Sequence, residues 1–232
     1  MTVSPHDVAR RAADVRQRVA DAGGNPDRIT LVAVTKGFPS SVAVAAATAG
    51  LVDQGENYAQ ELVAKAAEVG ELSTVPEVRW HWIGRLQSNK VRALAPVVHL
   101  WQSVDRPALI HEIARRAPGA AVLVQVNVSD EPAKGGCAPS AAADLVAQAR
   151  DQGLVVRGLM TVGRTGPPAD ARIGFEDLAR LADRLDLEER SMGMSADLEV
   201  AVRAGSTMIR VGGALFGPRP GRPLPGSDPA NR

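Results

Sequence analysis

Two kinds of hydrophobic pattern follow one another along the whole chain. Short, nearly continuous apolar runs, such as residues 28–36 (RITLVAVTK) and 120–129 (AAVLVQVNVS), predict strands that are buried on both faces. Between these runs apolar residues recur with helical spacing, and glycines such as Gly50 and Gly70 mark the expected helix ends. This order predicts repeated strand–helix units around a parallel sheet.

Eight such units are expected, preceded by an amphipathic helix that Ser4 and Pro5 open. They predict an α/β fold over residues 1–217: a single (β/α)8 barrel of the TIM type with an extra N-terminal helix. An open doubly wound sheet is the alternative, but neither a GxGxxG motif nor a P-loop follows the first strand. The Pro- and Gly-rich residues 218–232 predict a disordered tail. The expected strands are residues 28–36, 51–57, 78–84, 97–104, 120–129, 154–162, 189–194 and 207–217.

Charge and cysteine content restrict the classes of partner. The formal net charge is +1 over 232 residues, which gives no general attraction to nucleic acid or to an acidic membrane. Cys137 is the only cysteine, and the histidines lack metal-ligand spacing, so we expect no disulfide and no metal site. The charged N-terminal segment lacks the apolar core of a secretory signal. We therefore expect a cytoplasmic protein without a membrane span.

The first predicted strand ends in Lys36, one of only four lysines in the chain. Side chains alternate along a strand, so Val32, Val34 and Lys36 share one face. If that face lines the barrel, partial burial lowers the pKa of the Lys36 ammonium. A neutral amine at the mouth of a pocket forms Schiff bases with aldehydes. The alternative is a lysine that extends to solvent, and spacing alone favours it.

Two glycine-containing segments near the C-terminus predict an anion site. Ser195 is expected to cap a helix after the seventh strand, and Arg210 precedes Gly212 and Gly213 after the eighth. In TIM-type barrels the loops after these two strands frequently bind a phosphate group. Each segment alone is more simply explained as an ordinary helix start.

Other polar residues carry weaker indications. His81 lies between two tryptophans in a predicted strand, which favours a structural role. Glu56 either orients Lys36 or is a solvated loop acid, and Trp101 is expected in the core.

Taken together, several motifs resemble the YggS/PROSC family of pyridoxal phosphate homeostasis proteins. They are LVAVTKGFP, QGENYAQEL, WHWIGRLQSNK, GLMTVG and SMGMSADLEVAVRAGSTMIRVGGALFG, and they cover the chain to Gly217. The resemblance implies a barrel similar to the N-terminal domain of alanine racemase (fold type III), with pyridoxal 5′-phosphate (PLP) held as a Schiff base on Lys36. Family members usually have Ser or Thr where this chain has Gly213. The cofactor-binding residues that the resemblance implies are Lys36, Asn57, Ser195, Arg210, Gly212 and Gly213.

The resemblance also implies a role rather than a reaction. Family members bind PLP and help to balance its free level and that of amino and keto acids, so PLP and PLP-dependent apo-enzymes are the expected partners, and we expect a monomer. The alternative is an amino-acid racemase or lyase of low activity. Racemases of this fold take a second acid/base group from a tyrosine on another domain, whereas Tyr58, the only tyrosine here, begins a helix. We therefore expect no catalytic residue.

Overall fold

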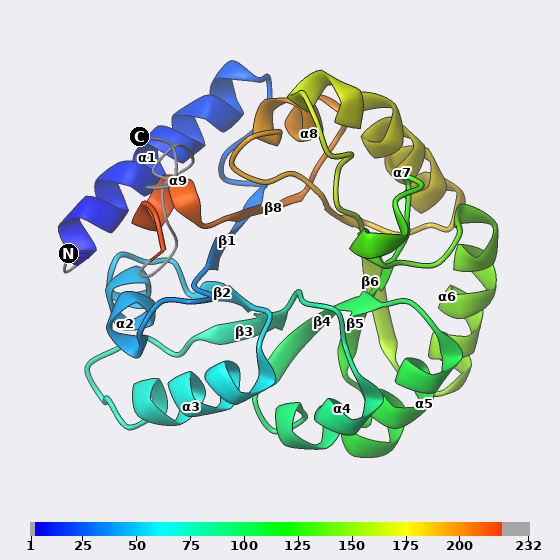
Figure 1. Ribbon diagram of the computed structural model, residues 1–232, viewed down its shortest axis with the longest axis horizontal. Helices are drawn as coiled ribbons and strands as arrows, with labels where there is room; N and C mark the ends of the chain where they lie inside the picture. Colours follow the sequence, from blue (N-terminus) through cyan, green and yellow to red (C-terminus); the bar gives the residue numbers. More distant parts are fainter. Residues whose placement is uncertain (1–2, 220–232) are drawn as a thin grey trace, which may run out of the picture.

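The eight predicted strands form a closed parallel barrel surrounded by helices (Figure 1). This computed structural model describes residues 3–219. Each strand pairs with the next one along the chain, and β8 pairs with β1 to close the ring. Val32 is opposite Arg210 in that closing pair. The barrel prediction is therefore confirmed, and the open doubly wound sheet is excluded.

The elements follow the predicted order, with shorter strands than the apolar runs suggested. The strands are β1 (Thr30–Val34), β2 (Asp53–Glu56), β3 (Arg79–Trp82), β4 (Val98–Val104), β5 (Ala121–Gln125), β6 (Val155–Met160), β7 (Glu189–Ser191) and β8 (Met208–Val211). The α-helices are α1 (Pro5–Asp21), α2 (Ser40–Thr48), α3 (Ala59–Gly70), α4 (Ser88–Leu94), α5 (Pro107–Arg116), α6 (Ala142–Asp151), α7 (Arg172–Arg184), α8 (Leu198–Arg203) and α9 (Gly213–Phe216). Three short 3₁₀ turns, η1 (Pro132–Lys134), η2 (Pro139–Ala141) and η3 (Pro168–Ala171), complete the described elements.

Apolar side chains pack on both sides of the barrel wall, as expected for parallel strands. Inside the barrel a small cluster of five buried side chains comes from different strands. A much larger layer lies between the strands and the helices, and it includes the predicted core residue Trp101. The inner cluster consists of Val32, Leu100, Leu123, Met160 and Met208.

Helix α1 is the predicted addition to the barrel. Its start is capped by Ser4, whose hydroxyl accepts a hydrogen bond from the N–H of Asp7 at 3.1 Å, and Pro5 occupies the first turn. Its apolar face packs over the seam between β1 and β8 and against α2, α8 and α9 (Figure 1). The buried residues of that face are Val8, Ala12, Val15 and Val19, which have helical spacing.

The last strand is shorter than its apolar run predicts. Residues 207–217 were expected as one strand, but β8 ends at Val211 and the short helix α9 follows. Gly212 takes non-strand backbone angles (φ −121°, ψ −68°), and its carbonyl accepts the N–H groups of Leu215 and Phe216. The apolar residues beyond the glycine therefore pack against α1 instead of extending the sheet.

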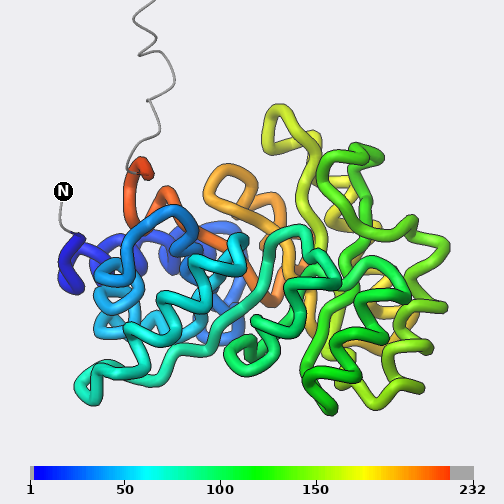
Figure 2. The backbone as a smooth tube through the Cα atoms, turned by 60° about the horizontal axis from the view of Figure 1, so that its bottom comes forward, coloured from blue at the N-terminus to red at the C-terminus, as the bar shows by residue number. Residues whose placement is uncertain are grey.

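The loops after the strands gather at one end of the barrel. Figure 2 shows the segments after β7 and β8, drawn in orange and red, rising on the same side of the ring. Within residues 3–219, no helix combines the length and the apolar character needed to cross a bilayer. Of the predicted tail, only Pro218 and Arg219 are described; residues 220–232 lie outside the described part.

Candidate functional site

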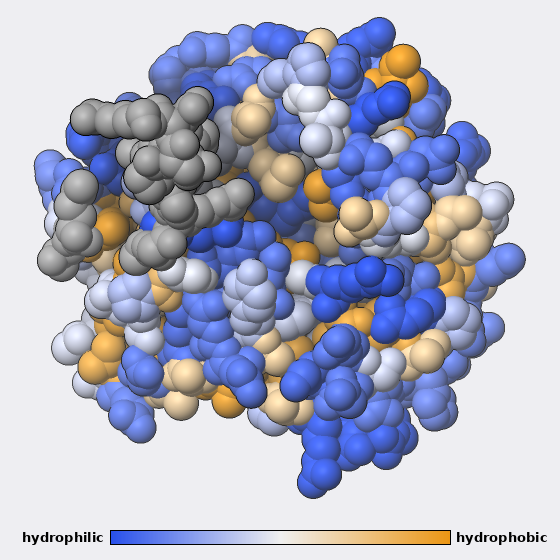
Figure 3. Space-filling model, viewed as in Figure 1, coloured by the Kyte–Doolittle hydropathy of each residue, from blue (hydrophilic) through white to orange (hydrophobic). Residues whose placement is uncertain are grey.

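Strand register places Lys36 between the loops that follow β2 and β8. Lys36 comes two residues after the end of β1, in the β1–α2 loop. Val34 is opposite Gly55 in β2, so the parallel register brings Lys36 beside Asn57. On its other side β1 pairs with β8, and a Cβ on Gly212 would lie 3.0 Å from the carbonyl oxygen of Val34. Figure 3 shows this face of the molecule, hollowed near its centre.

The Lys36 amine lies in a positively charged environment. Burial is the main cause that lowers its pKa, and the charges of Arg219 and Arg210 lower it further, whereas Glu56 opposes the shift. Arg219 lies against the residue that follows Lys36, because a Cβ on Gly37 would be 3.2 Å from the Cδ of Arg219. The lowered pKa raises the fraction of neutral, nucleophilic amine near pH 7.

A buried ion cluster holds the backbone on both sides of Lys36. Lys65 Nζ donates to the carbonyl oxygen of Thr35 at 2.8 Å, to Glu56 Oε1 at 2.6 Å and to Glu61 Oε1 at 2.7 Å. Glu61 Oε1 in turn accepts the N–H of Gly37 at 2.7 Å. The backbone of Thr35 and of Gly37 is therefore hydrogen-bonded to side chains of α3, and Lys65 also bonds to Glu56 of β2. These bonds fix the backbone from which the Lys36 side chain projects.

Glu56 has neither of its two predicted roles, orienting Lys36 or lying in solvent as a loop acid. Its side chain is fully buried, so it is not a solvated loop acid, and it bonds to Lys65 and to the hydroxyl of Thr35 instead of to Lys36. Burial raises its pKa, and the hydrogen bond and charge of Lys65 counteract that rise. Its second oxygen, Oε2, is buried without a hydrogen-bond partner in the described structure.

Arg210 projects into the barrel from β8, on the same face as Met208. It is 5% exposed, and burial is the main cause that lowers its pKa. Its Nη1 donates to Ser191 Oγ at 2.6 Å and its Nη2 donates to the carbonyl oxygen of Thr161 at 2.7 Å. Within residues 3–219, no carboxylate forms an ion pair with this guanidinium, so the barrel contains a cation that an anionic ligand would complement.

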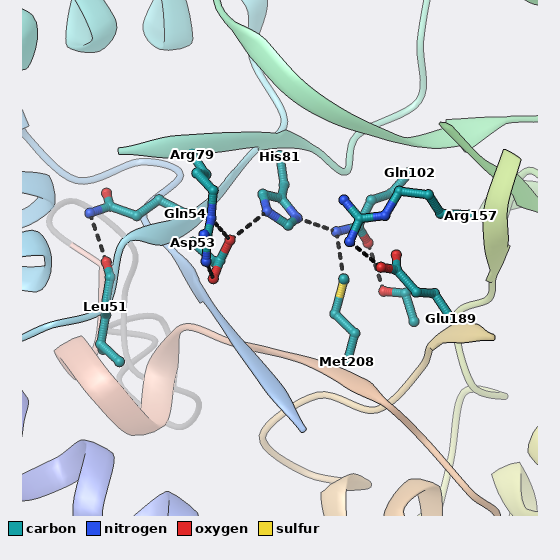
Figure 4. Close-up of polar contacts among 10 residues, drawn as sticks. Leu51, Asp53, Gln54, Arg79, His81, Gln102, Arg157, Glu189 and Met208 are labelled. Atoms are coloured by element: carbon teal, nitrogen blue, oxygen red, sulfur yellow. Dashed lines mark hydrogen bonds and ion pairs between the residues drawn. The ribbon is translucent and has the colours of Figure 1, made fainter. Parts of the chain in front are cut away.

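A line of hydrogen bonds continues from Arg210 through the barrel. Ser191 Oγ donates to Gln102 Oε1 at 2.6 Å, and Gln102 Nε2 lies 2.7 Å from His81 Nδ1. His81 Nε2 lies 3.1 Å from Asp53 Oδ1 at the start of β2 (Figure 4). The Gln102 amide nitrogen only donates, so His81 Nδ1 accepts and its Nε2 carries the proton toward Asp53. All donors in this line point from Arg210 toward Asp53.

His81 therefore has the structural role that its position between two tryptophans predicted. It is 2% exposed, and both of its ring nitrogens have partners. Burial acts to raise the pKa of Asp53, but hydrogen bonds from His81 and Arg79 outweigh it and hold that pKa well below its usual value. The carboxylate that ends the line is therefore ionised at neutral pH.

The loop after β7 is built differently from the prediction. Ser195 was expected as the helix cap, but it lies in a turn, and Asp197 occupies the cap position of α8. The carboxylate of Asp197 accepts the N–H of Met194 at 2.6 Å, so this side chain bonds back into the loop before the helix. Ser195 nevertheless lies at the same end of the barrel as Gly212, because the N–H of Arg210 bonds to the carbonyl of Gly193 at 3.0 Å.

Two further features fit a ligand at this end. Asn57 Oδ1 is buried without a hydrogen-bond partner among the described residues. The loop after β2, which carries Asn57, lies so close to the end of β3 that a Cβ on Gly84 would be 2.7 Å from Asn57 Cα. By contrast, a Cβ on Gly213 would meet no atom within 4 Å, so space is open beside the first turn of α9. The site thus offers an amine, a buried cation, an unpaired acceptor and an open glycine loop. No cluster of His, Cys, Asp or Glu with a metal-site arrangement occurs within residues 3–219.

Comparison with known proteins gives a consistent result. The chain matches the family described as alanine racemase, N-terminal domain, over residues 7–220. It is 38% identical over 231 residues to the pyridoxal phosphate homeostasis protein of Pseudomonas aeruginosa, covering 94% of this chain and 97% of that protein. The chain belongs to the pyridoxal phosphate homeostasis protein family. The Escherichia coli member is 36% identical over 231 residues, covering 92% of this chain and 97% of that protein.

Solved structures share the fold of this family member. PipY of Synechococcus elongatus, solved with PLP bound, is 33% identical and has a TM-score of 0.76, with 88% of this chain and 100% of that chain covered. Lysine decarboxylase from Selenomonas ruminantium, at 20% identity and a TM-score of 0.69, shares the barrel over 62% of its length. This second similarity concerns the fold alone.

Two residues that organise the site, Lys65 and Gln102, are absent from the predicted set. Lys65 lies three residues after Leu62 and four before Val69, which places it on the buried stripe of α3. A lysine on an apolar stripe is a signal of a buried ion pair. Gln102 gave no such signal, because its role depends on contacts with β3 and β7 that are distant in sequence.

Proposed function

We propose that this protein binds PLP as a Schiff base on Lys36 and takes part in keeping the cytoplasmic balance of the cofactor and of amino and keto acids. The observation that carries the proposal is the Lys36 amine, whose pKa is lowered by burial and by Arg219 and Arg210, at the mouth of the barrel. Family membership and the PLP-bound relative support the choice of ligand. We further propose that it acts as a monomer and supplies PLP to apo-enzymes.

Each residue of the site has a part in this proposal. Lys36 provides the amine for the aldehyde, and Asn57 Oδ1 provides an acceptor beside the ring. Arg210 provides a charge that the hydrogen-bonded line holds in place. Ser195 and the backbone of Gly212 and Gly213 lie where the phosphate would be held, with first-turn amides that have no intrahelical acceptor. When bound, PLP supplies an aldehyde and an electron-withdrawing ring.

The direct test is chemical trapping on the purified protein. PLP added to the apo-protein should give a visible absorption band, and borohydride reduction followed by peptide mass spectrometry should place the adduct on Lys36. A reduced adduct found on Lys65, Lys90 or Lys134 alone, with Lys36 unmodified, would contradict the site assignment.

The open space at Gly213 leads to a second prediction. Gly213→Ser should bind PLP about 2- to 10-fold more tightly, because one added hydrogen bond to a ligand contributes roughly 0.5–1.5 kcal/mol. A serine fits without strain, since a Cβ there meets nothing within 4 Å and Gly213 is not among the residues of positive φ. Gly213→Ala is the matched control, because it fills the same space without the hydroxyl. Equal PLP dissociation constants for the serine and alanine variants, measured by absorbance titration, would exclude a phosphate contact at this position.

A further inference from the structure

Helix α1 lies outside the barrel, yet it bonds to both loops that the proposed function assigns to the phosphate. Arg18 Nη2 donates to the carbonyl oxygen of Ser195 at 2.9 Å, in the loop after β7. Arg11 Nη1 donates to the carbonyl oxygen of Leu215 at 3.0 Å, in α9 after β8. We propose that Arg11 and Arg18 are positioning residues that hold these two loops at the spacing the phosphate group requires. The inference rests on the proposed function.

Arg18 is itself held in a defined orientation. Its Nε and Nη2 donate to the two carboxylate oxygens of Glu199, on α8, at 2.7 and 3.0 Å. The hydrogen bond from Arg18 is the main cause that lowers the pKa of Glu199. Both side chains are about one-third exposed, so this ion pair alone adds little stability. Its effect is geometric, because a planar guanidinium held at Nε and Nη2 by Glu199 directs the second N–H of Nη2 toward the carbonyl of Ser195.

The two loops need such support because neither is a stable element alone. α9 has only four residues, and a single helical turn does not persist without tertiary contacts. Arg11 supplies a donor to one of its terminal carbonyls, which have no intrahelical partner. Residues 195–197 form a turn, and the bond from Arg18 is its link to α1.

One rigid helix therefore sets the distance between the loops. Arg11 and Arg18 are seven residues apart, which places them on the same face of α1 about 10.5 Å apart along its axis. The helix is fixed in turn by its apolar face, which packs against α8, β8 and α9. Losing either arginine leaves this packing in place but removes the hydrogen bond by which the helix fixes the backbone of one loop.

The experiment compares PLP with pyridoxal, which has the same aldehyde and ring but no phosphate. In the double variant Arg11→Met/Arg18→Met we expect the dissociation constant for PLP to rise by about 10-fold, because hydrogen bonds from charged donors are the stronger ones. The dissociation constant for pyridoxal should stay within about 2-fold of the wild-type value. A merely structural loss would weaken both ligands alike, so an equal loss would overturn the inference, as would an unchanged PLP affinity.

Matched variants on the same helix complete the test. Arg16→Met removes an exposed arginine of α1 that lines a groove with Pro26 and Asp27, and it should leave both affinities unchanged. Arg18→Lys retains the charge but not the planar fork, and it should give a loss for PLP alone that is smaller than that of Arg18→Met. If the wild-type protein binds neither PLP nor pyridoxal, the proposed function itself fails, and this outcome is visible before any variant is made.

Discussion

Replacing Lys36 with alanine is expected to abolish the visible absorption band that PLP produces in the wild-type protein. The affinity for PLP should fall by about 100-fold or more, which corresponds to roughly 2.7 kcal/mol, because the covalent link is lost and only the polar contacts of the site stay. Titration of the apo-protein followed by absorbance measures both effects. The fold should tolerate the change, since the side chain projects from a loop and is half-buried.

The matched control for this variant is Lys90→Ala on α4, which removes a lysine that the proposal does not assign to the cofactor, although it lines the same groove as Asn57. It should retain the wild-type band and the borohydride-stable adduct. A Lys36→Ala protein that still forms the band with wild-type affinity would show that another amine carries the aldehyde.

The second large effect is expected from Lys65→Met, which removes the cation at the centre of the buried cluster. The free energy of unfolding should fall by about 3–5 kcal/mol, because breaking a buried ion pair leaves an uncompensated charge in the interior. Here the stranded group is Glu56, which is fully buried, and the carbonyl of Thr35 loses its donor as well. Urea denaturation of the apo-protein at pH 7, compared with Lys90→Met, measures the loss.

The pH dependence of this loss has a defined sign. Burial already raises the pKa of Glu56, and removal of Lys65 deletes the main opposing contribution, so in the variant the folded-state pKa lies further above the unfolded value. A group with a raised folded pKa stabilises the folded state below its unfolded pKa and loses that contribution as pH rises. The stability difference between the variant and the wild type should therefore shrink as the pH falls through the range in which glutamate side chains titrate.

Glu56→Gln added to Lys65→Met should recover part of the loss at pH 7. A deficit below about 1 kcal/mol, or one independent of pH, would show that the cluster is not a charged pair.

The fold was predictable because its main signal is local. Strands such as β1 and β5 are apolar runs and most of the longer helices have their own spacing, so the order of elements and the closed barrel follow from patterns that extend over ten to twenty residues, although β2 (DQGE) and β7 (ERS) are themselves polar. The error in the last strand has the same origin. Ala214 to Phe216 continue the apolar run after Gly212, but they pack as a helical turn against α1 and Phe38, which are distant in sequence.

The site was predictable to a smaller extent. Lys36, Asn57 and Arg210 could be selected as strand-end residues, and the structure brings them to the same end of the barrel. Of the residues that hold them, Lys65 carried a local signal in its place on the buried stripe of α3, whereas Gln102 carried none, because its role depends on contacts with β3 and β7 that are distant in sequence. Ser195 shows the limit of local rules, since α8 begins two residues later than expected, after Asp197, whose carboxylate accepts the N–H of Met194.

The closing pair of the ring has a consequence for how the protein is made. Lys36 follows the first strand, whereas Arg210 lies in the last strand and Gly212 directly after it, so the proposed site spans the seam where β8 pairs with β1. A nascent polypeptide still lacking its final strand has the amine but neither the buried arginine nor the glycine loop. The proposed site is therefore complete only once residue 213 has been added, and a chain shortened before that residue lacks the glycine loop.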